Sequence, residues 1–169
     1  MDNNVSFRVH KDELADAAAW VARSLPTKST QPVLRAVVIT ADDNGLEFAG
    51  FDYEVSTRVR IGAEVNDPGR VAVAGKLLAD IVGTMPNDAI EVSTDSKVMT
   101  LKARSSRFEL PLIALDDYPQ LPHLPEVTGR ISPAALTGAV TQVASAAGRD
   151  DTLPMLTGIH VEIDGENVT

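Results

Sequence analysis

The chain has 169 residues and a net charge of −9; 44% of its residues are hydrophobic and 23% are charged, ordinary values for a globular protein with room for one domain and part of another. The acidic balance argues against a protein that binds nucleic acid with its whole surface, but it permits a local basic strip. Cysteine is absent, which excludes disulfides and thiolate metal sites and fits the cytoplasm, where we expect the protein. We expect no secretory signal in residues 1–20 and no membrane span, because no apolar run approaches ~20 residues.

The sequence of residues 5–61 predicts a strand, a helix and three further strands. Residues 5–9 alternate between apolar and polar side chains, as in a half-buried strand. Residues 11–25 carry apolar side chains at three- and four-residue spacing, which predicts an amphipathic helix that ends before Pro26. Residues 42–45 contain the Asn-Gly pair of a hairpin turn. The remaining predicted strands cover residues 34–40, 46–48 and 55–61.

The same order of elements then recurs. Residues 75–85 predict a helix with its apolar side chains on one side. Strands are predicted over residues 70–74, 90–93, 98–103 and 107–112. We therefore predict one α+β domain made of two strand-helix-strand-strand-strand repeats, with antiparallel sheets on one face and both helices on the other.

A proline-rich stretch, residues 116–125, separates this domain from the beginning of another. Ser132 and Pro133 have the residue types of an N-cap and a first helical position, and the predicted helix continues to about residue 147. A strand is predicted over residues 156–163. We place the first domain at residues 1–121, a linker at 122–125 and an incomplete second domain at 126–169.

One short segment occurs twice at a fixed offset. Residues 30–34 are Thr-Gln-Pro-Val-Leu, and residues 152–156, 122 positions later (from 30 to 152), are Thr-Leu-Pro-Met-Leu. The same offset aligns the strand and the helix that precede each segment, with no gap. The second domain therefore begins as the first one does. Because the first domain needs several more strands after this point, we expect the chain to be a fragment of a longer protein.

No motif in the sequence points to catalysis. Glycine-rich phosphate loops and the nucleophile elbow of hydrolases are absent. His10, His123 and His160 stand far apart, with no partner at metal-ligand spacing. Three Asp-Asp pairs lie in predicted turns or loops, where solvated carboxylates are common. We expect no catalytic residue, no metal and no cofactor; an enzyme whose chemistry lies beyond Thr169 is the alternative.

Four basic residues lie on or just after the predicted helices: Arg23, Lys28, Lys76 and Arg149. If the helices share one face of the molecule, these side chains share it too and would contact phosphates without reading sequence. Ordinary surface charges at helix ends explain the same spacing equally well. Because the first predicted helix is net acidic, any contact with DNA should be loose.

The order and spacing of several segments resemble the bacterial sliding clamp family, the beta subunits of the replicative DNA polymerase III. The resemblance covers essentially the whole chain, and no single motif carries it alone. It rests on the opening strand and helix and on residues 30–34, 52–54, 73–77, 106–108, 117–119 and 156–158. It implies a DNA-clamp fold with three similar domains per subunit, of which this chain holds the first and the start of the second.

The resemblance also implies a function. Two clamp subunits close head to tail into a homodimeric ring, with helices lining the hole and sheets outside. Such a ring encircles duplex DNA without sequence specificity and tethers the polymerase III catalytic subunit. Further implied partners are the clamp loader and other replication and repair proteins that bind through a short peptide motif. The implied role is that of an accessory subunit, not an enzyme. A tandem-repeat protein-interaction module without DNA binding is the alternative.

Some of the basic residues match DNA-facing positions of the family. Lys28 and Lys76 match basic positions there, and Arg23 belongs to the same predicted strip. Arg149 lies in a loop that approaches DNA in the second domain of the family. Asp150 follows it where the family often has glutamine, so the resemblance to the family is weaker in this loop.

Other residues match surfaces that bind proteins. Leu156, Thr157 and Gly158 match one wall of the partner-peptide pocket, which lies between the second and third domains of the family. The subunit interface of the family uses the second helix and the last strand of the first domain. The corresponding residues are Leu77, Ile81, Arg107, Phe108 and Leu110, and strand alternation directs only part of this set outward.

Overall fold

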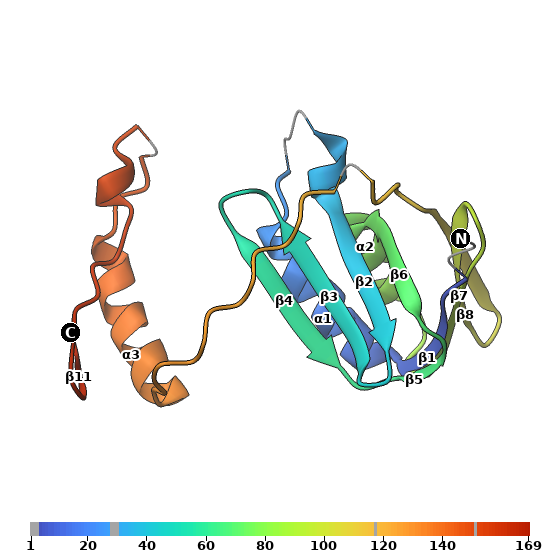
Figure 1. Cartoon of the computed structure of the whole chain (residues 1–169), viewed down its shortest axis with the longest axis horizontal. Coiled ribbons are helices and arrows are strands. Elements are labelled where there is room, and N and C mark those ends of the chain that lie inside the picture. Colours follow the sequence, from blue (N-terminus) through green and yellow to red (C-terminus); the bar gives the residue numbers. More distant parts are fainter. Residues whose placement is uncertain (1–3, 28–30, 117, 151) are drawn as a thin grey trace. The chain divides into compact units, whose positions relative to one another are not determined.

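The computed structural model describes residues 4–27, 31–116, 118–150 and 152–169. The chain forms two compact units, Met1–His123 and Leu124–Thr169, which we call unit 1 and unit 2 (Figure 1). Unit 1 combines two helices with antiparallel sheets, which confirms the predicted α+β class. No helix in the described part of the chain is both long and apolar enough to cross a membrane.

The elements of unit 1 follow the predicted order, with one strand and one 3-10 helix added. The added strand, β5 (Glu64–Asp67), is mostly polar and has no apolar alternation, so the sequence gives no signal for it. It forms because the outer edge of β1 is open for pairing, and Phe7 lies opposite Val65. The elements are β1 Ser6–His10, α1 Lys11–Ser24, η1 Pro32–Arg35, β2 Ala36–Asp42, β3 Gly45–Phe51, β4 Ser56–Ile61, β5 Glu64–Asp67, β6 Gly69–Ala74, α2 Gly75–Thr84, β7 Ala89–Thr94, β8 Val98–Ala103 and β9 Ser106–Pro111.

The 3-10 helix η1 corrects the predicted strand over residues 34–40. Pro32 begins η1, where its fixed φ and missing N–H suit a helical turn. The Leu34 N–H donates to the Gln31 carbonyl at 3.2 Å, and the Ala36 N–H donates to the carbonyl of Val33. The strand therefore begins only at Ala36.

Two antiparallel sheets join the two repeats of unit 1 by exchanging their first strands. The strand orders are β5-β1-β7-β8-β9 and β4-β3-β2-β6. Strand β1 of the first repeat pairs with β7 of the second, and β6 of the second repeat pairs with β2 of the first. Each sheet therefore needs both repeats. The exchange leaves β4 and β9, the last strands of the two repeats, at sheet edges.

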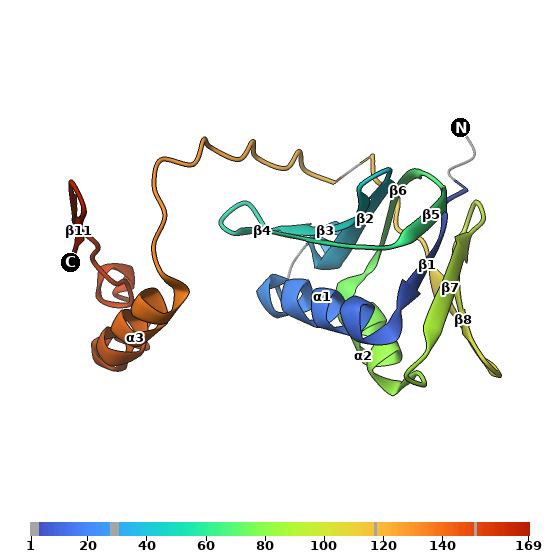
Figure 2. The same cartoon turned by 90° about the horizontal axis from the view of Figure 1, so that it is seen from below.

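Helices α1 and α2 pack against one another and cover one face of the sheets (Figure 2). Helix α1 begins after His10, whose ring Nδ1 accepts the Asp12 N–H at 3.4 Å. Asp12 and Glu13 lie in its first turn, where the helix dipole favours negative charge. The predicted apolar stripe faces the core and consists of Leu14, Ala17, Ala18 and Val21.

The start of α2 lies beside the end of α1. A Cβ on Gly75 would be 2.3 Å from Cδ1 of Leu25, the residue that caps α1. The absence of a side chain at Gly75 permits this approach. The first turn of α2 and the last turn of α1 are therefore neighbours, which matters for the basic residues that they carry.

Unit 1 has a main core and a smaller second one on opposite faces of the four-stranded sheet. Alternation along β2 sends Val37 and Ile39 into the main core and Val38 into the second. Residues 113–116 and 118–122, here called the strap, cover the second core, and Tyr118 is buried there. The proline-rich stretch therefore packs on unit 1 through Tyr118 and Leu121, whereas residues 122–125, the predicted linker, are exposed.

Unit 2 contains one helix, two short 3-10 helices and a two-stranded hairpin in its described part. These elements are α3 Pro133–Val143, η2 Ala144–Ala146, η3 Pro154–Leu156, β10 Ile163–Asp164 and β11 Asn167–Val168. The strand predicted over residues 156–163 is wrong for nearly all of its length. Only Ile163 and its neighbour Asp164 form a strand, because the described part of unit 2 offers residues 157–161 no strand to pair with.

The second unit repeats the first at the predicted offset. η3 matches η1, since Pro154 and Pro32 are 122 positions apart and each begins a 3-10 helix. The hairpins match as well. Asp164 pairs with Asn167 in unit 2, as Asp42 pairs with Gly45 in unit 1.

Candidate functional site

The structure brings two of the four predicted DNA-facing residues to the same end of the helix pair. Arg23 is exposed in the last turn of α1, and Lys76 is exposed in the first turn of α2. These two turns are neighbours through the contact of Leu25 with Gly75. Lys28 lies outside the described residues.

The opposite end of α1 carries negative charge. Asp12, Glu13 and Asp16 are exposed there, and the Lys11 ammonium lies 3.5 Å from the Asp12 carboxylate. The exposed side of α1 is therefore acidic at its beginning and basic at its end. A phosphate backbone would be attracted at the Arg23 end of α1 and repelled at the other end. The two effects partly cancel, so the net attraction to DNA would be weak.

Arg149 lies in a loop of unit 2, and hydrogen bonds of the residues on either side of Arg149 fix the loop backbone. The Gly148 N–H donates to the Leu156 carbonyl at 2.7 Å. The Asp150 carboxylate accepts the Thr152 N–H at 3.0 Å and its hydroxyl at 2.7 Å, and these hydrogen bonds lower the pKa of Asp150. Asp150 thus orders the backbone beside Arg149, and the exposed Arg149 side chain supplies the positive charge.

The residues predicted for the partner pocket lie directly after this loop. Leu156 ends η3 and is exposed, as is Gly158. The Thr157 hydroxyl donates to the Pro154 carbonyl at 2.7 Å, which caps the turn. Because the Leu156 carbonyl also holds Gly148, the loop of Arg149 and the wall of the predicted pocket form one connected feature.

The face of α3 that corresponds to the buried stripe of α1 is uncovered in unit 2. Leu136, Val140 and Val143 correspond to Leu14, Ala18 and Val21 at the 122-residue offset. The α1 residues are buried, whereas those of α3 are exposed and line an apolar hollow with residues of the segment 156–161.

Only some of the residues predicted for the subunit interface are accessible, and the structure corrects the prediction for Leu110. Strand β9 is the edge of the five-stranded sheet, and its alternate residues point into the core. Leu110 is completely buried opposite Met99, so its side chain packs in the core of unit 1 and is not part of the accessible surface of this unit. Ile81 and Phe108 are half-buried against the main core.

The exposed members of this set are Leu77 and Arg107. Leu77 lies in the first turns of α2 with 43% of its surface accessible. The Arg107 guanidinium donates to the Glu109 carboxylate at 2.6 Å, on the exposed side of β9. An apolar side chain and a charged pair thus flank the free edge of the sheet.

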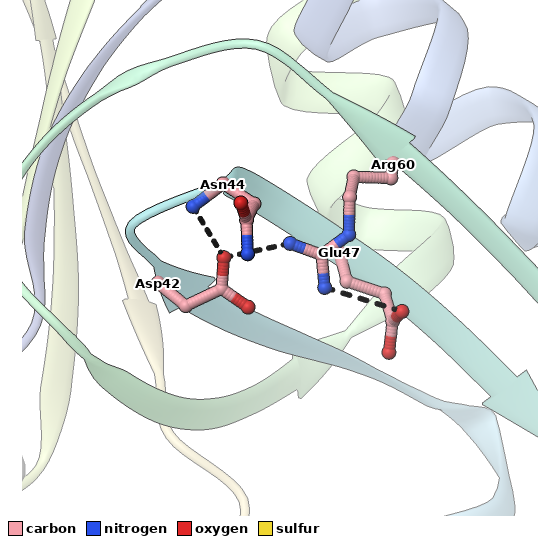
Figure 3. Close-up of polar contacts among 4 residues, drawn as sticks. All are labelled: Asp42, Asn44, Glu47 and Arg60. Atoms are coloured by element: carbon pink, nitrogen blue, oxygen red, sulfur yellow. Dashed lines mark hydrogen bonds and ion pairs between the residues drawn. The ribbon is translucent and has the colours of Figure 1, made fainter.

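A polar cluster that the sequence does not single out joins three strands at one hairpin (Figure 3). Arg60 of β4 donates to Asp42 of β2 at 2.7 Å and lies 3.4 Å from Glu47 of β3. Asp42 also accepts the Asn44 N–H at 2.8 Å. The hydrogen bond from Arg60 is the main cause that lowers the pKa of Asp42. These side chains join three strands and satisfy one another's hydrogen-bonding groups, so we assign them a structural role.

The described residues give no metal site. They contain no group of three or more histidine, aspartate or glutamate side chains close enough to hold an ion. Of the three Asp-Asp pairs in the sequence, residues 116–117 and 150–151 each have one member, Asp117 or Asp151, outside the described residues. In the third, Asp42 belongs to the arginine cluster.

The family comparison covers nearly all of unit 1. The family model described as the N-terminal domain of the DNA polymerase III beta subunit matches residues 5–122. The beta sliding clamp of Streptomyces coelicolor is 48% identical over 165 residues, which are 98% of this chain and 44% of that protein. The beta sliding clamp of Micrococcus luteus is 44% identical, over 98% of this chain and 53% of that protein. The chain spans about half the length of these curated relatives.

Solved structures share the fold across both units. The sliding clamp of Bacillus subtilis matches with a TM-score of 0.83 at 23% identity, over 95% of this chain and 45% of that one. A sliding clamp of Pseudomonas aeruginosa, in a crystal structure with bound griselimycin, matches with a TM-score of 0.83 at 27% identity, over 96% and 45% of the two chains. With a family model that covers more than half of its residues, the chain belongs to the DNA polymerase III beta subunit family.

Proposed function

We propose that this chain is the N-terminal part of a sliding clamp subunit that encircles duplex DNA and tethers the replicative polymerase in the cytoplasm. The family match over residues 5–122 carries the proposal, because relatives matched over nearly the whole chain are beta sliding clamps. The role is that of a processivity accessory without chemistry of its own. Its partners are the polymerase III catalytic subunit, the clamp loader and other replication and repair proteins.

The DNA-facing surface in this proposal is the basic end of the helix pair. Arg23 and Lys76 supply positive charge there, and the acidic beginning of α1 limits the strength of the contact. Lys28 and Arg149 are further contacts in the proposal. A ring that is topologically linked to DNA needs little affinity, and tight phosphate contacts would slow its sliding.

The subunit junction in this proposal is the free edge of β9. An edge strand exposes unpaired backbone groups that a strand of another subunit can extend. Leu77 and Arg107 are the accessible side chains beside this edge, with Ile81 and Phe108 contributing their exposed parts. The ring is a head-to-tail homodimer of the complete subunit.

Partner proteins dock on unit 2 in this proposal, through a short peptide motif that reaches Leu156, Thr157 and Gly158. The exposed Leu156 side chain supplies apolar contact, and the neighbouring hydrogen bonds fix its position. These residues form one wall of the pocket only.

Primer extension on a long single-primed template tests the proposal. The complete subunit, added with clamp loader and polymerase, should lengthen the products made in one binding event. Products of unchanged length would refute the tethering role and favour an interaction module that does not serve replication.

A further inference from the structure

The hairpin loop between β3 and β4, residues 52–55, presents a tyrosine in an unfavourable backbone conformation. Tyr53 has a φ of 74°, in the left-handed region that favours glycine and asparagine. Among the described non-glycine residues, only Arg104 shares a positive φ. A bulky residue in this region costs free energy, and such outliers concentrate at functional sites.

Hydrogen bonds from Asp52 impose this conformation. The Asp52 Oδ1 accepts the Val55 N–H at 2.7 Å and the Glu54 N–H at 3.0 Å. The Asp52 N–H donates to the Val55 carbonyl at 3.2 Å and closes the loop. The turn is therefore ordered without any help from the Tyr53 side chain, and a glycine at this position would fit the turn better.

The Tyr53 ring packs against a second aromatic ring and is exposed to solvent. Its centroid lies 5.6 Å from that of Phe51, with the rings tilted by 56°. Phe51 packs against the second core, which the strap residues Tyr118 and Leu121 complete. Tyr53 remains 60% exposed and Val55 49% exposed. The loop thus holds an apolar patch rigidly out of the fold.

The charge beside this patch is negative. Glu54 is exposed, and no ion pair engages its carboxylate in the described part of the chain. The guanidinium of Arg58, in the following strand β4, donates to the Pro122 carbonyl at 2.5 Å. A phosphate backbone would be repelled at the Glu54 carboxylate, whereas lysine or arginine would be attracted.

We propose that Tyr53, Val55 and Glu54 form a docking site on unit 1 for a protein segment with an apolar side chain flanked by lysine or arginine. Tyrosine is among the residues that dominate binding energy at protein interfaces, because it buries a large ring with little loss of conformational entropy. Preorganisation by Asp52 removes most of the ordering cost from the binding step. The site lies wholly within unit 1 and does not depend on ring closure or DNA binding.

Selection from a random library of 12-residue peptides on phage tests the proposal. The immobilised 169-residue chain is the bait, and the Tyr53→Ala variant removes peptides that bind elsewhere. Surviving peptides are synthesised, and their affinity is measured by fluorescence anisotropy. We expect a shared pattern of one apolar residue with lysine or arginine within a few positions. Tyr53→Ala and Glu54→Lys should each weaken binding about tenfold or more, whereas Tyr53→Phe, which keeps the ring, should not.

Thermal unfolding of Tyr53→Gly separates binding from folding. We expect this variant to unfold at the same or a higher temperature while it loses the selected peptides. A clear loss of stability would overturn the proposal, because the ring would then serve the fold. Three other results would also overturn it: no peptide survives the counter-selection, acidic peptides are selected, or sedimentation shows a dimer of the chain that Tyr53→Ala dissociates.

Discussion

Leu34 and Leu156 stand 122 residues apart, each at the third position of a 3-10 helix that begins with proline, and they differ in exposure. Leu34 is 6% exposed in unit 1, and Leu156 is 59% exposed in unit 2. One local sequence thus takes one local structure twice, while its surroundings differ. In unit 1 the side chain belongs to the interior, whereas in unit 2 it is on the surface.

The β2–β3 turn should require glycine at position 45. Gly45 has a φ of 104°, and a Cβ there would be 2.3 Å from the Ile61 backbone oxygen. Gly45→Ala should destabilise unit 1 by about 1–3 kcal/mol. Gly83→Ala is the matched control: no atom lies within 4 Å of its added Cβ, and helix propensity predicts a gain of up to about 1 kcal/mol. Urea unfolding followed by the fluorescence of Trp20, the single tryptophan, measures both.

Leu110 and Leu77 should respond differently to truncation. Leu110→Ala removes a fully buried side chain and should lower the free energy of unfolding by about 2–5 kcal/mol. Leu77→Ala removes a largely exposed one and should cost about 0.5 kcal/mol or less. In the complete subunit, however, Leu77→Ala should weaken dimerisation, as measured by sedimentation equilibrium. A stable Leu110→Ala variant with weakened dimerisation would contradict our correction of the interface.

The ion pair between Asp42 and Arg60 should make stability depend on pH. The folded-state pKa of Asp42 is lowered, chiefly by the hydrogen bond from Arg60. Its contribution is therefore fully present above the unfolded pKa, about 3.9, and is lost as pH falls through the folded pKa. Asp42→Asn should flatten the decline of the unfolding midpoint below about pH 4. Asp43→Asn, which changes the same charge one residue away, should leave more of that decline in place.

The basic end of the helix pair should contribute to DNA binding without sequence preference. In the complete subunit, Arg23→Gln and Lys76→Gln should each weaken the salt dependence of binding to a short duplex. The slope of the logarithm of the association constant against the logarithm of the salt concentration should fall in magnitude by about one. The control is Lys102→Gln, which changes an exposed lysine on the sheet, on the side away from the core. If Lys102→Gln reduced this slope and Lys76→Gln did not, DNA would lie on the sheet face that carries Lys102 and not on the helix face.

Local patterns in the sequence predicted most of unit 1. Alternation and helical spacing identified both helices and all strands except β5, whose residues Glu64–Asp67 carry no apolar pattern. That strand depends on the open edge of β1, which is a property of the assembled sheet. The prediction for Leu110 failed for a similar reason. Alternation along β9 indicates that the strand has two faces, but only the packed sheet shows which of them points into the core.

Site residues were less predictable for the same physical reason. Arg23 and Lys76 are 53 positions apart, from 23 to 76, and lie at the same end of the helix pair because α2 begins at Gly75, beside Leu25. Tyr53 looks like an ordinary turn residue in the sequence. Its importance follows from a backbone angle and a ring contact, neither of which has a sequence signature.

Retention of the complete subunit on circular and linear duplex DNA is the most direct test of the clamp function. The clamp loader places the labelled protein on a nicked circle, and gel filtration then separates bound from free protein, before and after the circle is cut once. We expect retention on the circle and loss from the cut molecule at the same salt concentration, because a ring slides off a free end. Equal retention on both would contradict this expectation and mean that the protein is held by contacts alone.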